Sequence, residues 1–460
     1  MSFNVLKFGG TSVANFDAMN RCARIIAKDT NNKLVVVSAS AGVTDLLSQL
    51  GNCIQDAAER SAHIEKIRTI EDAILRELCA DNQRQVRPII NAALDKITSL
   101  SATLAEHGKN PILRDSLLAT GEQMSSHLMC YVLQEQNIKV AWLDATAFMR
   151  TNEDFGKADV DTDFLKNAIA NAMDFSSADV FITQGFIGGT EEGQTTTLGR
   201  GGSDYSAALM AEGLKAKTLQ IWTDVPGLYT TDPRIVPDAR PIGEISFPEA
   251  AEMATFGAKI LHPKTLWPAV RSNIPVFVGS SRNPEQGGTE ICPADQCRNS
   301  DDNRLTAIAL RQDQVLITLT SLDMLHSFGF LARAFQVLAD YKVSVDLVTT
   351  SEVSVALTLD DPDRKGHHIP KGLLEDLEKL GDVTVTRDLA LIALIGNGIS
   401  NAAGVSAKVF QTIEDIPIRL ICQGASQHNL CFLVDQQNAA AAVKRIHDQL
   451  FHDTAIGESA

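Results

Sequence analysis

The sequence contains no apolar run long enough to span a membrane, and its start, "MSFNVLKFGG", lacks the basic-then-apolar pattern of a signal peptide. A basic excess is also absent, because 41 Lys and Arg face 57 Asp and Glu, giving a formal net charge of -16. Nucleic acids and anionic membranes require basic surfaces, so neither kind of partner is expected. We therefore predict a soluble, cytoplasmic protein that binds small molecules.

No CxxC pair occurs among the eight cysteines, and none lies at a metal-type spacing from histidine. This pattern favours free thiols and gives no reason to predict a metal held by the protein alone. The ten histidines are scattered, and the sequence has neither an HExxH motif nor a Ser-His-Asp arrangement. The chemistry must therefore use other groups.

At 460 residues the chain is too long for one compact core, so two or three domains are expected. "FNVLKF", the glycine turn "GGTS", an amphipathic helix and the apolar strand "KLVVVSAS" form a βαβ unit at the N-terminus. This order predicts an α/β sandwich around a parallel sheet. Residues 44–136 are strongly helical in pattern and predict a helical lobe over one end of that sheet.

The C-terminal third repeats itself after a polar stretch at 292–303 that reads as a linker. Gly329 aligns with Gly404 and Asp360 with Asp435, both at an offset of 75, since 404 − 329 = 75 and 435 − 360 = 75. Each copy reads as strand, glycine turn, helix, strand, hairpin and strand. The tail is therefore predicted to be a duplicated ferredoxin-like unit.

Two glycine-rich or hydroxyl-rich turns follow the first two predicted strands. "KFGGTS" at 7–12 offers backbone N–H groups and a lysine to an anion, although a tight βα turn explains it equally well. It is not a Walker A loop, because the lysine precedes the glycines. "SASAGVT" at 38–44 ends the second strand, and ligands of open α/β sheets bind at carboxyl ends of strands. Together the two turns favour a phosphate or carboxylate site.

A third motif, "TTTLGRGGSDYS" at 195–206, places glycines around Arg200 and before Asp204. Arg200 suits bidentate binding of a carboxylate, whereas Asp204 reads either as a helix-start acid or as a group that orients Lys7 or a metal-bound nucleotide. Glu122 likewise reads as a first-turn acid or as a ligand for a substrate ammonium. Phosphoryl transfer to a carboxylate fits this inventory, because the acceptor is ionised at pH 7 and needs no general base.

Five motifs carry a resemblance over nearly the whole chain: "KFGGTSV", "SASAGVTDLL", "TTLGRGGSDYSA", "WTDVPGLYTTDPR" and "EMATFGAKILHP". In this order they resemble the aspartate kinases of the amino acid kinase superfamily. The tail "SFGFLARAFQVL" with "VSVDLVTTSEVSVALTL" is similar to the paired ACT domains of bacterial lysine-sensitive aspartate kinases. The resemblance implies ATP-dependent phosphorylation of the L-aspartate side-chain carboxylate, with Mg2+ accompanying ATP and feedback inhibition by L-lysine.

The resemblance also implies a division of the chain. Residues 1–297 would form the amino acid kinase domain. Residues 298–314 would be a linker and the first strand of the second ACT unit, 315–388 the first ACT domain, and 389–460 the remainder of the second. A homodimer through the ACT domains is the implied assembly, with a tetramer as an alternative.

Site residues follow from matching motif positions. Lys7 and Asp204 would be catalytic, and Gly9 and Gly10 would form the phosphate loop. The residues implied to hold aspartate are Thr44, Glu122, Arg200 and Ser203. Those implied to hold ATP are Lys7, Thr223, Asp224, Tyr229, Arg234, Lys259 and Ile260.

The repeat indicates which ACT copy binds an amine. The first copy carries Asp346 and Glu352, where the second carries Ile421 and Gln427 at the same offset. An effector ammonium requires acids, so the first copy is the expected site. The family's lysine site corresponds to Met324, Ser327, Phe330, Leu331, Ser344, Val345, Asp346, Ser351 and Glu352. At Phe328 the family has arginine, a departure within an otherwise matching loop.

Three alternatives remain at this stage. A kinase acting on glutamate or N-acetylglutamate would share the phosphate loops but would not need tandem ACT units. A non-catalytic amino-acid sensor would have no use for Lys7 and Asp204, which are both present. Threonine could replace lysine as the effector of an aspartate kinase.

Overall fold

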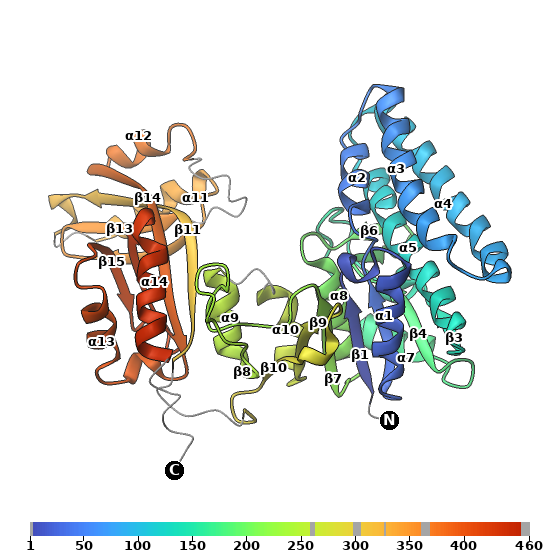
Figure 1. Cartoon of the computed structure of the whole chain (residues 1–460). Helices are drawn as coiled ribbons and strands as arrows, with labels where there is room; N and C mark the ends of the chain where they lie inside the picture. The colour runs from blue at the N-terminus through green and yellow to red at the C-terminus, as the bar shows by residue number, and fades with distance from the viewer. Residues whose placement is uncertain (1–2, 258–262, 298–304, 326–327, 360–368, 452–460) are drawn as a thin grey trace, which may run out of the picture. The chain divides into compact units, whose positions relative to one another are not determined.

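The computed structural model describes residues 3–257, 263–297, 305–325, 328–359 and 369–451. The chain forms two compact units, each coloured by its position along the sequence in Figure 1. Unit 1 comprises residues 1–228, 243–247 and 260–298, and unit 2 comprises residues 229–242, 248–259 and 299–460. Within the described residues, no helix combines the length and apolar character needed to cross a bilayer.

Unit 1 contains an eight-stranded sheet in the order β3-β4-β2-β1-β7-β9-β10-β8. Its neighbouring strands are parallel except for the antiparallel pair β9 and β10. The strands are β1 (Asn4–Phe8), β2 (Asn32–Val37), β3 (Val140–Trp142), β4 (Val180–Gln184), β7 (Thr218–Thr223), β8 (Glu244–Ser246), β9 (Val276–Ser280) and β10 (Gly288–Cys292). Every residue of β1 and β4 is buried, as expected for a parallel sheet covered on both faces.

Helices α2 to α5 form the helical lobe that the sequence predicts, and Figure 1 shows these helices grouped together. Two of these helices, α3 and α5, begin with side-chain caps: Asp56 accepts from the Ala58 N–H, and Asn110, which precedes Pro111, accepts from the Leu113 N–H. The helices that belong wholly to unit 1 are α1 (Phe16–Ala27), α2 (Val43–Leu50), α3 (Ala57–Leu75), α4 (Ala80–His107), α5 (Pro111–Glu135), α6 (Ala145–Phe148), α7 (Thr162–Ala172), α8 (Gly202–Gly213) and α10 (Pro263–Arg271). A small antiparallel sheet pairs β5 (Ile187–Gly189) with β6 (Thr195–Thr197).

Unit 2 contains a six-stranded antiparallel sheet in the order β12-β13-β11-β14-β16-β15. The first copy of the repeat is β11 (Leu305–Thr320), the 3-10 turn η3 (Leu322–Met324), α11 (Phe330–Asp340), β12 (Val345–Thr350), β13 (Ser354–Leu359) and α12 (Leu373–Glu378). The second is β14 (Asp382–Gly396), η4 (Ile399–Asn401), α13 (Val405–Thr412), β15 (Ile418–Gln423), β16 (Asn429–Asp435) and α14 (Gln436–Phe451).

The aligned glycines of the two copies have the same structural task. Gly329 and Gly404 cap α11 and α13 in the left-handed conformation, with φ of 77° and 84°. A side chain at either position would be strained, which explains why both copies carry glycine. The predicted fold class, an α/β kinase-type sandwich followed by two ferredoxin-like units, is confirmed.

Strand β11 contributes to both copies. Its residues 305–311 pair with β14 at 391–396, which pairs on its other side with β16. Its residues 316–320 pair with both β13 and β14. One long strand thus joins the two ferredoxin-like units into a continuous sheet.

Two segments that precede the predicted linker pack with unit 2. In the first, at 229–242, Val236 is fully buried in a core that includes Phe432 and Ile446, and the Thr230 hydroxyl hydrogen-bonds His447 Nε2 at 2.9 Å. The second contains most of α9 (Phe247–Phe256), where Glu252 accepts hydrogen bonds from the Ser426 hydroxyl and the Asn429 amide. The apolar pattern alone does not distinguish these segments from the rest of the kinase region.

The expectation of free thiols is wrong for one pair, because Cys292 and Cys297 form a disulfide. A turn closes between them, with the N–H groups of Gln296 and Cys297 both donating to the Pro293 carbonyl, and brings their Cα atoms to 5.9 Å. That separation lies within the normal disulfide range. The other six cysteines are free.

We predict that Val236→Ala loosens unit 2, because it removes buried methyl groups from a close-packed core, at a cost of about 2 kcal/mol. Hydrogen exchange on the full chain should accelerate at amides of β14 and β16. Amides of β1 and β2 in unit 1 should exchange at the wild-type rate. Ile235→Ala, at a half-buried neighbour, is the matched control and should have the smaller effect. Unchanged exchange in β14 and β16 would contradict the packing assigned to Val236.

Candidate active site

Lys7 and Asp204 form an ion pair at the carboxyl ends of the parallel strands of the unit 1 sheet. Lys7 lies next to the carboxyl end of β1, and Asp204 lies in the first turn of α8. Lys7 Nζ and Asp204 Oδ1 are 2.7 Å apart, with 10% and 21% of the side chains exposed. The contact has the distance of an ion pair without the geometry of a directed hydrogen bond. The two residues predicted to be catalytic are therefore adjacent.

Of the two phosphate-loop glycines, Gly10 lies where no side chain has room, whereas a Cβ at Gly9 would make only ordinary contacts. A Cβ on Gly10 would lie 2.9 Å from the Ala39 carbonyl oxygen, closer than van der Waals contact permits. A Cβ on Gly9 would lie 3.6 Å from Lys7 Nζ and 3.7 Å from the Trp222 carbonyl oxygen. Glycine at position 10 thus allows the first loop to touch the loop that follows β2.

The interpretation of Glu122 as a first-turn acid is wrong, because α5 begins at Pro111 and Glu122 lies in its middle. It is buried against the loop after β2, with only 3% of its surface exposed. The Ala39 N–H donates to its carboxylate, and one carboxylate oxygen has no hydrogen-bond partner among the described residues. Burial raises the pKa of Glu122 to about 8, against the opposing effects of the Ala39 hydrogen bond and the Lys7 charge. A cationic ligand placed against this carboxyl group would favour its ionised form. Thr44, at the start of α2, is exposed.

Asp115, an acid that was not predicted to be functional, fixes the start of the loop between β6 and α8 through hydrogen bonds. Asp115 Oδ2 accepts hydrogen bonds of 2.8 Å from the N–H groups of Gly156 and Thr197. Gly199 and Gly201 then adopt the left-handed conformation, with φ of 76° and 73°. No local motif could identify Asp115, because it acts on residues 41 and 82 positions away.

The remaining predicted residues of this loop differ in exposure. Arg200 is exposed, whereas Ser203 is half-buried and packs against Gly185, where an added Cβ would lie 2.7 Å from the Ser203 Cβ. Arg200 therefore faces solvent in the part of the loop where a soluble carboxylate could reach it.

Thr223 ends β7, the strand next to β1, and Asp224 follows it. The Thr223 hydroxyl donates to Asp224 at 3.1 Å, and the Ser281 hydroxyl donates to the Thr223 carbonyl at 3.1 Å. Ser281 also shares a 2.6 Å hydrogen bond with Ser12. Ser281 is a second residue missed from the sequence, although the strand "IPVFVGSS" ending in hydroxyls could have indicated it.

The other four predicted nucleotide residues are Tyr229, Arg234, Lys259 and Ile260. Tyr229 and Arg234 belong to unit 2, where Arg234 is 81% exposed and pairs with Asp232 at 2.6 Å. Lys259 and Ile260 lie outside the described residues.

The predicted effector residues lie on η3, α11, β12 and the turn after it, all in unit 2. Asp346 pairs with Arg311 of β11 at 2.9 Å, with 11% and 14% of the two side chains exposed. Ser351 and Glu352 are exposed in the turn, and Phe330 is buried in the core. Met324 and Val345 are half-buried, Leu331 and Ser344 are exposed, and Ser327 lies outside the described residues. Arg311 was not predicted.

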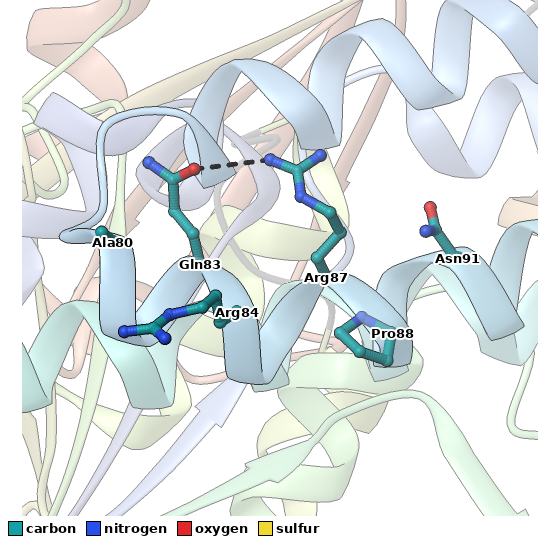
Figure 2. Close-up of a pocket in the computed structure, with 6 residues that line it drawn as sticks. All are labelled: Ala80, Gln83, Arg84, Arg87, Pro88 and Asn91. Carbon is teal, nitrogen blue, oxygen red and sulfur yellow. Dashed lines mark hydrogen bonds between the residues drawn. The ribbon is translucent and has the colours of Figure 1, made fainter.

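A surface groove of about 570 Å³ lies along α4, in the helical lobe. Figure 2 shows its lining, where Arg87 donates to the Gln83 amide oxygen at 3.4 Å. The lining residues are Ala80, Gln83, Arg84, Arg87, Pro88 and Asn91. None belongs to the predicted sites, and the groove lies away from the carboxyl ends of the strands, where α/β proteins bind ligands.

Within the residues that the structure describes, one group brings metal-type ligand atoms within 4.8 Å of one another: Glu244, Cys292 and Cys297. The two sulfur atoms are joined in the disulfide. They are therefore not the thiolates that a metal requires.

Two protein families match parts of this chain. The amino acid kinase family matches residues 2–280, and the ACT domain family matches residues 392–450. The chain is 51% identical over 453 residues to the lysine-sensitive aspartokinase 3 of Escherichia coli, covering 97% of this chain and 99% of that protein. It is 31% identical to the chloroplastic aspartokinase 1 of Arabidopsis thaliana, covering 99% of this chain and 81% of that protein.

Two crystal structures of E. coli aspartokinase III are similar over 98% of this chain, both at 50% identity. The complex with aspartate and ADP (R-state) gives a TM-score of 0.84 and is covered over 100% of its length. The complex with lysine and aspartate (T-state) gives a TM-score of 0.83 and is covered over 99%. The similarity therefore includes both the kinase-type region and the duplicated tail.

We predict that the burial of Glu122 lowers stability as pH rises. Its pKa in the folded state, about 8, exceeds the ordinary value of 4.5, so the folded state favours the protonated carboxyl group. The contribution to stability is complete below pH 4.5 and is lost as pH rises towards 8. Glu122→Gln carries no such charge. In urea unfolding without ligands, the wild type should therefore lose stability relative to the variant between pH 5 and 8. An equal difference at both pH values would contradict the prediction.

Proposed function

The chain belongs to the aspartokinase family of amino acid kinases, and on that premise we propose that it transfers the terminal phosphoryl group of ATP to the side-chain carboxylate of L-aspartate. The products are 4-phospho-L-aspartate and ADP, the first step towards lysine, threonine and methionine. The observation that carries the proposal is the ion pair of buried Lys7 with partly exposed Asp204 at the carboxyl ends of the sheet strands. The proposed reaction uses ATP and a free amino acid, which fits a cytoplasmic location.

The proposed chemistry uses charge and position. The aspartate carboxylate attacks the terminal phosphorus, the bond from that phosphorus to the bridging oxygen breaks, and ADP leaves with the electron pair. Lys7 opposes the negative charge on the transferred group, in surroundings where little water weakens the interaction. Asp204 holds the Lys7 ammonium in place, which restricts a flexible side chain before the substrate arrives.

Four residues are proposed to hold L-aspartate. Arg200 would bind its α-carboxylate through a bidentate contact, and Glu122 would accept the α-ammonium, whose charge compensates a buried carboxylate. Thr44 and Ser203 would add hydroxyl contacts. The unpartnered Glu122 oxygen supports this assignment, because a buried acceptor of this kind requires a donor.

The nucleotide is proposed to lie over Gly9 and Gly10, with its remaining contacts made by Thr223, Asp224, Tyr229, Arg234, Lys259 and Ile260. Mg2+ is proposed to arrive with ATP, and it supplies neutralisation of the phosphate oxygens. Asp204 fits such a group because a partly exposed carboxylate at the phosphate loop offers the oxygen ligand that Mg2+ prefers. No other protein ligand is assigned to it.

L-lysine is proposed as the feedback inhibitor, bound by the first ferredoxin-like copy. Two acids there, Asp346 and Glu352, have the uncharged counterparts Ile421 and Gln427 in the second copy. The other proposed contacts are Met324, Ser327, Phe330, Leu331, Ser344, Val345 and Ser351. Threonine is the alternative effector.

A homodimer through unit 2 is proposed, with a tetramer as the alternative. Large apolar side chains are exposed along η3 and α11: Leu322 is 80% and Phe328 97% exposed, and Leu325, Leu331 and Phe335 are exposed to a lesser degree. A group of exposed apolar residues of this kind is typical of a protein interface.

The function is tested by trapping the acyl phosphate with hydroxylamine in the presence of MgATP and L-aspartate. Hydroxamate formation that L-lysine suppresses is the expected result. Suppression by L-threonine alone would support the proposed kinase activity but show that threonine, and not lysine, is the effector. Hydroxamate from L-glutamate or N-acetylglutamate but not from L-aspartate would overturn the proposed substrate.

We predict that Gly10→Ala reduces kcat/KM at least about tenfold, because its Cβ would force the Ala39 carbonyl, and with it the loop after β2, to move. Gly243→Ala is the matched control, since a Cβ there meets nothing within 4 Å and its φ is not positive. Steady-state hydroxamate kinetics should show the control within about twofold of the wild type. Equal activities for both variants would show that the contact at Gly10 is unimportant.

We predict that Asp346→Ala keeps turnover within about twofold but raises the half-inhibitory lysine concentration at least about tenfold, because the acid for the effector ammonium is lost. Ile421→Ala changes the equivalent position of the second copy and should leave inhibition intact. Lysine titrations of both variants measure the effect. An Asp346→Ala enzyme that remains fully lysine-sensitive would show that the first-copy assignment is incorrect.

A further inference from the structure

A second fully buried acid, Glu71, lies beneath the loop after β2. It belongs to α3, where the other glutamates, Glu59 and Glu65, are exposed. One Glu71 carboxyl oxygen accepts a long hydrogen bond, 3.4 Å, from the Ser40 hydroxyl. The other oxygen is buried without a hydrogen-bond partner among the described residues. The proposed mechanism does not use this residue.

Packing alone does not account for an acid at this position. The nearest buried positions on the same face of α3 are Ile67 and Ile74, so an apolar side chain would continue the core without burying a polar group. Burial raises the pKa of Glu71 to about 8, although the Ser40 hydrogen bond lowers it. At neutral pH the carboxyl group is therefore mostly protonated, and it can both donate and accept a hydrogen bond.

Hydrogen bonds fix three successive residues of the loop that Glu71 contacts, 38–40. The Ser125 hydroxyl donates to the Ser38 carbonyl at 2.7 Å, and the Ala39 N–H donates to Glu122. Ser40 is 1% exposed, and its carbonyl accepts from the Val43 N–H at 3.0 Å, which starts the helix containing Thr44. Ser40 therefore connects Glu71 to two residues of the proposed aspartate site, Glu122 through Ala39 and Thr44 through Val43.

We propose that Glu71 is a positioning residue for the acceptor amino acid. It fixes the Ser40 hydroxyl, and through Ser40 it fixes the loop whose Ala39 and Thr44 face the acceptor. This inference rests on the proposed function, which assigns that loop to L-aspartate. Among the described residues, the hydrogen bonds of Ser40 join Glu71 and Val43 and do not reach the ends of β7 and β9, so the effect should fall mainly on the acceptor.

The test compares Glu71→Leu, Glu71→Gln and Ser40→Ala in the full chain, by hydroxamate kinetics with each substrate varied. Glu71→Leu should raise KM for L-aspartate about tenfold while KM for ATP stays within about twofold. Glu71→Gln should stay within about threefold, because an amide also donates and accepts. Ser40→Ala should raise KM for L-aspartate, and adding it to Glu71→Leu should have little further effect, because both changes remove the same contact.

Ile74→Ala is the matched control, since it weakens the core on the same helix without touching Ser40. It should lower the unfolding temperature while leaving KM for L-aspartate unchanged. The proposal is overturned if Ile74→Ala raises this KM as much as Glu71→Leu does, or if Ser40→Ala and Glu71→Leu raise it additively. If Glu71→Leu does not fold, Ser40→Ala with Glu71→Gln decides the matter, and an unchanged KM in Ser40→Ala overturns it.

Failure of the proposed function is separable from failure of this inference. A wild-type enzyme that makes hydroxamate from another amino acid, and not from L-aspartate, would overturn the proposed substrate alone. The same variants would then be measured with that acceptor. A KM for it that Ser40→Ala leaves unchanged would overturn the role of Glu71 independently.

Discussion

The structure of unit 1 depends on keeping one lysine ammonium charged while most of its side chain is out of water. Lys7 lies on the central strand β1, with β2 and β7 on either side, so its stem is buried by the sheet itself. Asp204 compensates the charge at 2.7 Å from a helix that begins at a left-handed glycine. A buried cation without this acid would be strongly destabilised. The glycine loop before α8 therefore positions Asp204 beside the Lys7 ammonium, in addition to any contact that it makes with a ligand.

Two carboxyl groups are buried close to the loop after β2, and burial disfavours their charged forms. Glu71 and Glu122 both have a pKa raised to about 8, so near neutral pH each carries little charge in the absence of a cation. Lys7 lowers the pKa of Glu122, and a substrate ammonium would lower it further. In the proposed site, Glu122 would thus become fully charged only when a cation lies against it, which limits the cost of burying it while the site is empty.

The fold was largely predictable because its signals are local or repeated. The offset of 75 aligns Gly329 with Gly404, and both residues cap helices in the same conformation. Motif order brought together Lys7 and Asp204, since Lys7 directly precedes one recognisable glycine turn and Asp204 directly follows another. Asp115, Glu71 and Arg311 escaped prediction because each depends on contacts that the sequence does not encode locally. Cys292 and Cys297 are only five residues apart, but their spacing alone does not show that a turn at Pro293 brings the two cysteines together. Val236 illustrates the limit: its apolar character is visible, but nothing nearby indicates that it completes the core of unit 2.

Arg311 changes how the proposed inhibition must be understood energetically. Because Asp346 already pairs with Arg311 at a nearly buried position, an effector ammonium does not meet a bare carboxylate. Binding exchanges one cation for another, or shares the acid between them, so the net electrostatic gain is smaller than the new contact alone suggests. The released guanidinium is then available for the carboxylate of the same zwitterionic amino acid. A ligand with both charges can compensate both members of the Arg311–Asp346 pair, whereas a simple amine offers no anion to Arg311. The proposed site is therefore expected to favour amino acids over simple amines, because Arg311 and Asp346 are paired with each other when no ligand is bound.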